Sequence, residues 1–184
     1  MVPTSIARIE GPNLILRLIQ PDDADYVYIL RTDPAYNQHL SDVRGTAEDQ
    51  RQWIEAYKAR EAGLRELYYV IERRDGTRCG LVRLYDIKAD SFIWGSWILD
   101  HNKTSKAALE SAVLSFGVGF DGLGLSLAHV DVRVGNDRAV AFYQRLGMTE
   151  LRRDDRDIYF AYPRSQFEAD RGGYLAILEV QSVA

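Results

Sequence analysis

The hydrophobic positions of this chain follow two different periods. Apolar residues at every second position, or in short β-branched and aromatic runs, predict strands. The segments with this pattern are residues 13–18, 67–71, 79–87, 91–99, 128–134, 148–151 and 158–162. Between residues 104 and 121 the apolar positions instead recur at intervals of three and four, which predicts an amphipathic helix. The chain therefore mixes strands and helices.

Capping signals predict where further helices begin. Thr46, followed three residues later by Asp49, resembles a capping box. Asn136 is a typical N-cap, and Gly147 is a typical residue just beyond a helix end. The helices expected from such signals are residues 21–32, 46–60 and 136–147, with a helical tail after residue 163.

The order of these elements predicts the fold class. Asp75-Gly76 between two apolar runs is a hairpin signal, and the first half of the chain is rich in such turns. In the second half, strands and helices alternate, and the helix at 104–121 is long enough to connect parallel neighbours. We expect an α/β (mixed α+β) fold with a central, mostly antiparallel twisted sheet of about seven strands and helices on both faces. It would form a single domain, residues 1–184, with a core at 13–162 and a tail at 163–184.

Composition and charge exclude several classes of protein. The chain is 46% hydrophobic, and its formal net charge is -4, whereas general nucleic-acid binders are usually basic. It contains no apolar run long enough to span a membrane, and the first residues lack the apolar segment of a signal peptide. The single Cys79 and three scattered histidines give no metal-ligand spacing. We therefore expect a cytoplasmic protein with no nucleic-acid partner, no membrane partner and no metal.

A motif near residue 140 carries a family resemblance. After a predicted strand the chain reads Asn136-x-x-Ala139-x-x-Phe142-Tyr143-x-x-x-Gly147-Met148. This resembles the strand–helix signature of the GNAT superfamily of N-acyltransferases. The segments Leu16-Arg17-Leu18 and Pro21-x-Asp23-Ala24, Arg31-Thr32-Asp33-Pro34, and the helix around Trp53 resemble its RimJ/RimL-like subgroup. The resemblance implies a GNAT fold and acetylation of a primary amine with acetyl-CoA as cosubstrate.

The loop that would bind the CoA pyrophosphate departs from the family pattern. The family usually has glycines there, but this chain reads His101-Asn102-Lys103-Thr104-Ser105-Lys106-Ala107-Ala108. A helix N-terminus still offers N–H groups and a positive dipole to an anion, although glycine normally allows a closer approach. Hydroxyl and ammonium groups would add donors. The residues expected at the phosphates are Lys103, Thr104, Ser105 and Lys106.

The resemblance also implies the groups that meet the thioester. Tyr143 would lie near its sulfur, and a phenol of pKa about 10 can protonate the leaving thiolate. An ordinary packed tyrosine on the inner helix face is the alternative. Asn136 would contact the cofactor or simply cap its helix. The other residues expected along the cofactor are Trp97, Ile98, Leu99, Ala139 and Phe142.

The general base stays open at this stage. Related enzymes often carry a glutamate on the fourth strand, where this chain reads Phe92-Ile93-Trp94-Gly95. Asp86, at the end of a strand, and His39, in a loop, are candidates. A chain of ordered water molecules with no single base is an equal alternative.

The acceptor is expected between the first helices, the fourth strand and the last hairpin. Residues 31–40 resemble the loop of nucleotide-linked amino-sugar N-acetyltransferases of the pseudaminic-acid pathway type, and also RimJ/RimL-like enzymes that acetylate protein N-termini. Arg31, Tyr36 and Trp94 are the candidate contacts. We favour a small amine or amino sugar. A protein N-terminus, a non-catalytic acyl-CoA-binding module and a homodimer stay open as alternatives.

One further motif has a structural interpretation. Gly117-x-Gly119-x-x-Gly122 matches the dinucleotide-binding pattern, but it lies inside and at the end of a predicted helix rather than between a strand and a helix. We expect these glycines to allow close packing of the helix on the sheet.

Overall fold

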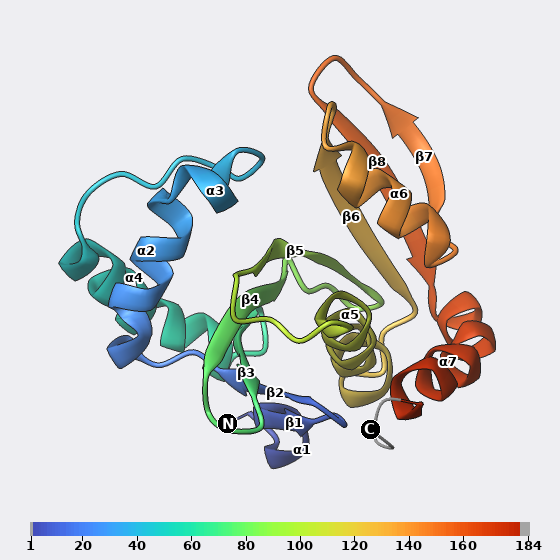
Figure 1. Ribbon diagram of the computed structural model, residues 1–184, viewed down its shortest axis with the longest axis horizontal. Helices are drawn as coiled ribbons and strands as arrows, with labels where there is room; N and C mark the ends of the chain where they lie inside the picture. Colours follow the sequence, from blue (N-terminus) through green and yellow to red (C-terminus); the bar gives the residue numbers. More distant parts are fainter. Residues whose placement is uncertain (1, 181–184) are drawn as a thin grey trace.

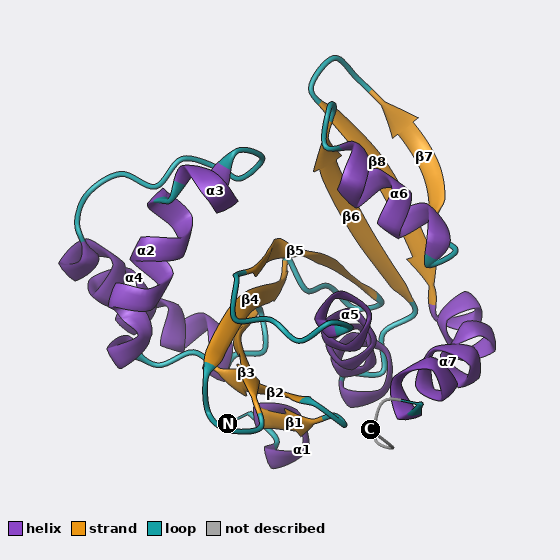
Figure 2. Cartoon of the chain, in the orientation of Figure 1, coloured by secondary structure: helices purple, strands orange, loops and turns teal. Residues whose placement is uncertain are grey.

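The computed structural model describes residues 2–180, and in this part of the chain eight strands form one sheet (Figures 1 and 2). The strands are β1 (Arg8–Glu10), β2 (Leu14–Leu18), β3 (Leu67–Arg73), β4 (Arg78–Tyr85), β5 (Ser91–Leu99), β6 (Leu127–Arg133), β7 (Thr149–Arg153) and β8 (Asp157–Pro163). Their order is β1-β2-β3-β4-β5-β6-β8-β7. Only β5 and β6 are parallel, so the expected mixed, mostly antiparallel sheet is confirmed, with one strand more than expected.

Helices cover both faces of this sheet (Figure 2). They are α1 (Thr4–Ala7), α2 (Ala24–Thr32), α3 (Pro34–Asn37), α4 (Ala47–Ala62), α5 (Ala107–Gly117), α6 (Asp137–Arg145) and α7 (Arg164–Glu179), with a 3-10 turn η1 (Pro21–Asp23) and a π turn η2 (Val118–Gly122). α2 and α4 pack with residues of β3 and β4 in one buried cluster. α5, α6 and α7 contribute to a second cluster.

The capping signals locate the helix starts well. Thr46 accepts a hydrogen bond from the Asp49 N–H, and the Asp49 carboxylate accepts one from the Thr46 N–H, which is the predicted capping box. The Asn136 side chain accepts from the Ala139 N–H at the start of α6. The predicted tail is helical to Glu179, and its last residues, 181–184, lie outside the described part of the chain.

Three short elements were not predicted from the sequence patterns. α1 and β1 precede the first predicted strand, and α3 follows Asp33 where a loop was expected. Elements of three or four residues are too short to show a period. α5 begins at Ala107 rather than Thr104, because residues 101–106 form turns.

β5 and β6 separate after a short parallel ladder (Figure 1). The paired residues are Ser91 with Leu127, Phe92 with Ala128 and Ile93 with His129. Beyond them β5 continues along β4, and β6 continues along β8. Ser96 has a φ of 47°, unusual for a residue other than glycine, beside a register shift in the β4–β5 ladder. This irregularity turns β5 away from β6.

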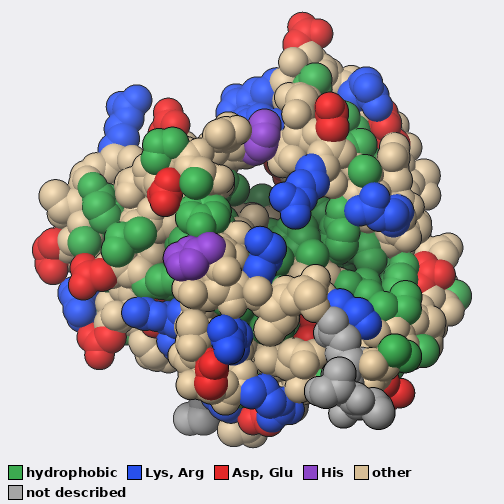
Figure 3. Space-filling model, viewed as in Figure 1, with side chains coloured by type: hydrophobic (Ala, Val, Ile, Leu, Met, Phe, Trp, Pro, Cys, Tyr) green, Lys and Arg blue, Asp and Glu red, His purple; other side chains and the backbone are tan. Residues whose placement is uncertain are grey.

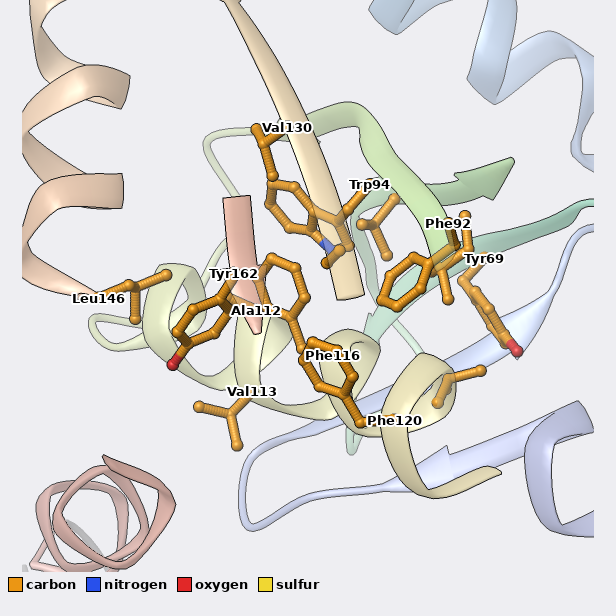
Figure 4. Close-up of a cluster of buried hydrophobic side chains, with 14 of the residues drawn as sticks. Tyr69, Phe92, Trp94, Ala112, Val113, Phe116, Phe120, Val130, Leu146 and Tyr162 are labelled. Atoms are coloured by element: carbon orange, nitrogen blue, oxygen red, sulfur yellow. The ribbon is translucent and has the colours of Figure 1, made fainter. Parts of the chain in front are cut away.

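A cluster of aromatic rings fills the core under this separation (Figure 4). Trp94 of β5 stacks on Phe116 of α5 with centroids 4.8 Å apart, and Phe116 meets Tyr162 of β8 edge-on at 5.3 Å. A Cβ on Gly119 would lie 2.3 Å from the ring of Phe92. Gly119 therefore allows the expected close packing on the sheet, whereas Gly122 makes room for Ile6 of α1, and no side chain crowds Gly117.

Candidate active site

A cleft of about 370 Å³ opens where β5 and β6 separate. Its lining comes from α3, β5, the turn before α5, and α6. The lining residues are Ala35, Tyr36, Trp97, Ile98, Leu99, Lys103, Ala108, Asn136, Arg138, Ala139, Phe142, Tyr143 and Arg145. In the space-filling view the middle of this face is hollowed and shows hydrophobic side chains, with Lys and Arg side chains around it (Figure 3). We call this space the donor cleft.

Aromatic side chains form the walls of the donor cleft. The rings of Trp97 on β5 and Phe142 on α6 lie 5.1 Å apart, and the Trp97 indole N–H donates to Ser111 Oγ at 3.1 Å. Beyond Ile93 the edge of β5 that faces β6 has no strand partner within residues 2–180. An extended, largely apolar ligand with amide groups fits such an edge, because an unpaired strand offers its backbone N–H and C=O groups.

Tyr143 lies at the inner end of this cleft. Its ring meets Trp94 edge-on at 6.0 Å and Phe160 at 5.9 Å, and only 6% of the residue is exposed. Burial raises the pKa of the phenol, and the nearby Asp131 and Tyr85 raise it further. Tyr143 is therefore held in its protonated form at neutral pH, which suits a proton donor.

The turn before α5 places the expected phosphate-binding residues in different surroundings. Lys103 lines the cleft. Thr104 Oγ1 is buried without a hydrogen-bond partner, and Ser105 belongs to the same turn. Lys106, expected beside the phosphates, instead donates from Nζ to the Ile177 carbonyl at 2.6 Å. Its ammonium is thus directed to α7 and away from the cleft lining.

A second, polar pocket of about 170 Å³ lies on the other side of Gly95 and Ser96. It is lined by His39, Leu40, Ser41, Tyr85, Gly95, Ser96, Asp131, Arg133 and Asp157. We call it the polar pocket. The two pockets are adjacent along β5, because Ser96 lines the polar pocket and the next residue, Trp97, lines the donor cleft.

Asp131 is the carboxylate of the polar pocket that has no cation of its own. Asp157 is ion-paired with Arg133 at 2.9 Å, whereas Asp131 has no ion pair among the described residues. Asp131 is exposed by surface area, but the protein atoms around it partly desolvate its carboxylate and raise its pKa, and the charge of Asp157 raises it further. The Tyr85 phenol beside it has its pKa raised to about 12, chiefly by burial and then by Asp131. This carboxylate is placed to hold a cation or to accept a proton.

The sequence analysis missed Asp131, although part of the signal was present. Ala128, Val130 and Val132 alternate on the buried face of β6, so Asp131 had to lie on the other face. A strand pattern does not show which neighbouring strand leaves the sheet. It therefore gave no sign that this face opens into a pocket.

Of the two predicted bases, one lines the polar pocket and one does not. His39 lies in the lining together with Asp131. Asp86 lies at the β4–β5 turn with a φ of 48°, and its carboxylate is paired with Lys88 at 2.9 Å. Asp86 is not among the pocket residues, and we do not retain it as a base. At Gly95, in the stretch of β5 without an acid, an added Cβ would lie 3.3 Å from Tyr85 Oη.

The three predicted acceptor contacts are separated in space. Tyr36 lines the donor cleft, and its hydroxyl accepts from the His101 N–H at 3.3 Å. Arg31 lines a third pocket, beyond the polar one. Trp94 is fully buried, and its indole N–H donates to Ser115 Oγ at 2.8 Å. Trp94 is a core residue here and does not line any of these pockets, because both faces of its ring are packed in the aromatic cluster.

No group of three or more His, Cys, Asp or Glu side chains within residues 2–180 is arranged to hold a metal ion. Across the same residues, each helix is too short or too polar to cross a membrane.

Comparisons with known proteins place the chain in a family. A family model described as an acetyltransferase (GNAT) domain matches residues 13–149, and the chain belongs to this family, as the resemblance predicted. No curated protein matches the sequence. Among solved structures, apo FdhC, a nucleotide-linked sugar GNAT, is 36% identical with a TM-score of 0.86, covering 93% of this chain and 98% of that one. Mutant forms of the spermidine/spermine N-acetyltransferase SpeG from Vibrio cholerae share 19% identity and a TM-score of 0.72, over 88% of this chain and 99% of theirs, which shows a common fold.

Proposed function

We propose that this protein transfers the acetyl group of acetyl-CoA to the primary amine of an amino sugar. Family membership supports acetyl transfer, and the 36% identity to a nucleotide-linked sugar GNAT supports the class of acceptor. One observation carries the proposal. An aromatic cleft with an unpaired strand edge meets a pocket with an unpaired carboxylate, at the point where β5 leaves β6.

The donor cleft fits a CoA molecule. Lys103 offers a positive charge at its lining, and the N-terminus of α5 offers a positive dipole to phosphate groups. The buried, unpartnered hydroxyl of Thr104 has a hydrogen to donate to such an anion. Trp97 and Phe142 would exclude water from the arm that follows, and the unpaired edge at residues 97–99 would bond its amides. When bound, acetyl-CoA supplies the thioester carbonyl that the amine attacks.

The residues at the junction would manage the protons of this reaction. An alkyl amine is protonated at neutral pH, so Asp131 first holds the ammonium and then takes a proton from it. The amine nitrogen then forms a bond to the acetyl carbon as the carbon–sulfur bond breaks. Tyr143, whose pKa is raised by burial, donates its phenolic proton to the departing sulfur, and the second proton that the nitrogen loses as the amide forms restores the phenol. His39, which lines the same pocket, is available to pass the proton taken by Asp131 to solvent.

An acceptor screen with purified protein tests the proposal. Acetyl-CoA binding is measured first by calorimetry. Thiol release is then followed with nucleotide-linked amino sugars, free amino sugars, spermidine and a peptide with a free N-terminus. Turnover with an amino sugar is the expected result. Acetylation of the peptide alone would assign the protein to N-terminal acetylation, and no binding at millimolar acetyl-CoA would indicate a non-catalytic module.

A further inference from the structure

A third pocket lies next to the polar pocket, and its lining contains more arginine side chains. It has a volume of about 460 Å³ and is lined by Arg31, Ser41, Asp42, Val43, Arg44, Asp49, Gln50, Trp53, Tyr68 and Arg83. Three arginines from α2, β4 and the loop between α3 and α4 converge on it. That loop runs between α3 and α4 in Figure 1. We call this space the arginine pocket.

The arginine pocket and the polar pocket form neighbouring parts of one groove. Ser41 lines both of them. Arg83 and Tyr85 are two residues apart on β4 and therefore point to the same face of the sheet. The guanidinium of Arg83 lies 4.8 Å from the centroid of the Tyr85 ring. A molecule with its amine at Asp131 can therefore extend over Tyr85 toward Arg83, which lies two residues, or about 7 Å, further along β4.

Two polar groups of this pocket lack the partners that buried groups normally have. Arg31 Nε is buried without a hydrogen-bond partner, and so is the hydroxyl of Tyr68, a residue that is only 1% exposed. The two lie side by side without a well-formed hydrogen bond, and the Arg31 charge opposes the rise in the Tyr68 pKa that burial causes. Buried groups that lack a well-formed hydrogen bond are uncommon, and both of these groups can donate to an anion placed between them.

The charges around these two donors leave Arg31 available. Its Nη2 donates to the Ser41 carbonyl and hydroxyl at 3.1 and 2.8 Å, and it has no carboxylate partner among the described residues. Arg83 is paired with Glu66, which also pairs with Arg60. Of the acids in the lining, Asp49 is occupied by the capping bonds to Thr46, so Asp42 is the acid that counters Arg31 and Arg44.

We infer that the arginine pocket binds a phosphate or diphosphate group of the acceptor, so that the substrate is an amine with a phosphate about one sugar ring away from it. This inference rests on the proposed acyl transfer and names its substrate class. Arg31 supplies the planar guanidinium that matches phosphate oxygens, and Tyr68 supplies a neutral hydroxyl beside it. A polycationic acceptor is disfavoured, because its second charged group would face these arginines.

The binding test uses thymidine diphosphate and inorganic pyrophosphate, titrated into the intact protein at fixed ionic strength. Saturating desulfo-CoA is present so that the donor cleft does not take up the probe. The variants are Arg31→Gln, which keeps a donor to Ser41, and Tyr68→Phe, which removes only an unpartnered hydroxyl and so preserves the packing. Arg51→Gln is the matched control, because Arg51 on α4 pairs with Asp22 of η1 and lies outside the pocket lining.

We expect both probes to bind the wild type and Arg51→Gln equally, at least tenfold more weakly to Arg31→Gln, and several-fold more weakly to Tyr68→Phe. The KM for a phosphate-bearing acceptor should rise in the same order, with the dissociation constant of acetyl-CoA unchanged. Equal binding to wild type and Arg31→Gln would overturn the inference, and so would weaker binding in Lys103→Ala alone. Arg31-dependent binding without turnover of any amine would instead reject the acyl transfer, whereas turnover that is indifferent to Arg31 would reject only the phosphate site.

Discussion

The donor cleft and the groove formed by the polar and arginine pockets are built by different kinds of contact. In the donor cleft, a strand edge and aromatic rings from β5 and α6 provide the contacts, and the charged side chains of the lining, Lys103, Arg138 and Arg145, are all cationic. In the polar and arginine pockets, charged side chains and the loop between α3 and α4 provide them. The donor end thus depends on backbone that any sequence of this fold supplies, while the acceptor end depends on individual side chains.

This difference indicates which residues select the acceptor. An edge of backbone N–H and C=O groups binds the same extended ligand whichever residues flank it. Side chains such as Asp131 and Arg31 instead select a ligand by charge and position. Substitutions at the acceptor end should therefore change acceptor choice, those along the donor cleft should change acetyl-CoA affinity, and those at Asp131 and Tyr143, where the two regions are adjacent, should change turnover. Four substitutions distinguish the roles of the donor cleft and the acceptor end.

Asp131→Asn should lower kcat by about 10²–10⁴-fold, because an amide cannot accept the amine proton. In the wild type, kcat/KM should rise with pH as Asp131 loses its proton, at a pH above that of an ordinary aspartate because its pKa is raised. This acidic limb should be absent from the variant. Asp86→Asn is the control, since Asp86 pairs with Lys88 outside the pocket and asparagine tolerates its positive φ. The measurement is steady-state kinetics across a range of pH. If Asp131→Asn keeps the acidic limb of kcat/KM, Asp131 does not accept the amine proton.

Tyr143→Phe should lower kcat by about 10–100-fold, the lower range of acid catalysis, while the dissociation constant of acetyl-CoA stays the same. The control is Tyr162→Phe, which removes a buried hydroxyl without a hydrogen-bond partner in the same aromatic cluster. Calorimetry measures the dissociation constant of acetyl-CoA, and thiol release measures kcat. Equal rates for both variants would mean that the Tyr143 hydroxyl has only a packing role.

Gly95→Ala should raise the acceptor KM by about three- to tenfold, equivalent to roughly 1 kcal/mol of crowding, because its new methyl group would meet Tyr85 Oη at 3.3 Å. The affinity for acetyl-CoA should not change. Adding Tyr85→Phe should recover part of the loss, so a double-mutant cycle on KM measures the coupling. Additive effects of the two substitutions would show that the methyl group and the hydroxyl do not compete for space.

Lys103→Ala should weaken acetyl-CoA binding by at most about fivefold, because an exposed charge contributes about 0.2–1 kcal/mol. Lys106→Ala should leave it unchanged, since Nζ of Lys106 is bound to the Ile177 carbonyl. The effect of Lys103 should shrink as salt is added. A larger loss in Lys106→Ala than in Lys103→Ala would reverse the assignment of the two lysines.

Much of the fold could be predicted from the sequence, because its signals are local. The capping box at Thr46 and the N-cap at Asn136 give the starts of two helices directly, and alternation gives the long strands. β1 and α3 were missed because they are too short to show a period.

The donor cleft could be predicted further than the acceptor end. Residues 136–143 form a local motif that carries the family pattern, and most of the residues expected from it line the cleft. Asp131 became visible only from long-range geometry, since the positive φ of Ser96 and the short β5–β6 ladder open the space beside it. The direction of Lys106 likewise depends on α7, which is distant in the sequence.

The short β5–β6 ladder has a mechanical consequence. Three residue pairs hold the two strands together, and the remaining connection passes through rings such as Phe116 of α5, Tyr162 of β8 and Phe167 of α7. Ring contacts are less directional than a backbone ladder and permit small rotations without breaking a bond. A rotation about this joint would move the walls most at the mouth of the donor cleft, where the proposed cosubstrate would enter and leave.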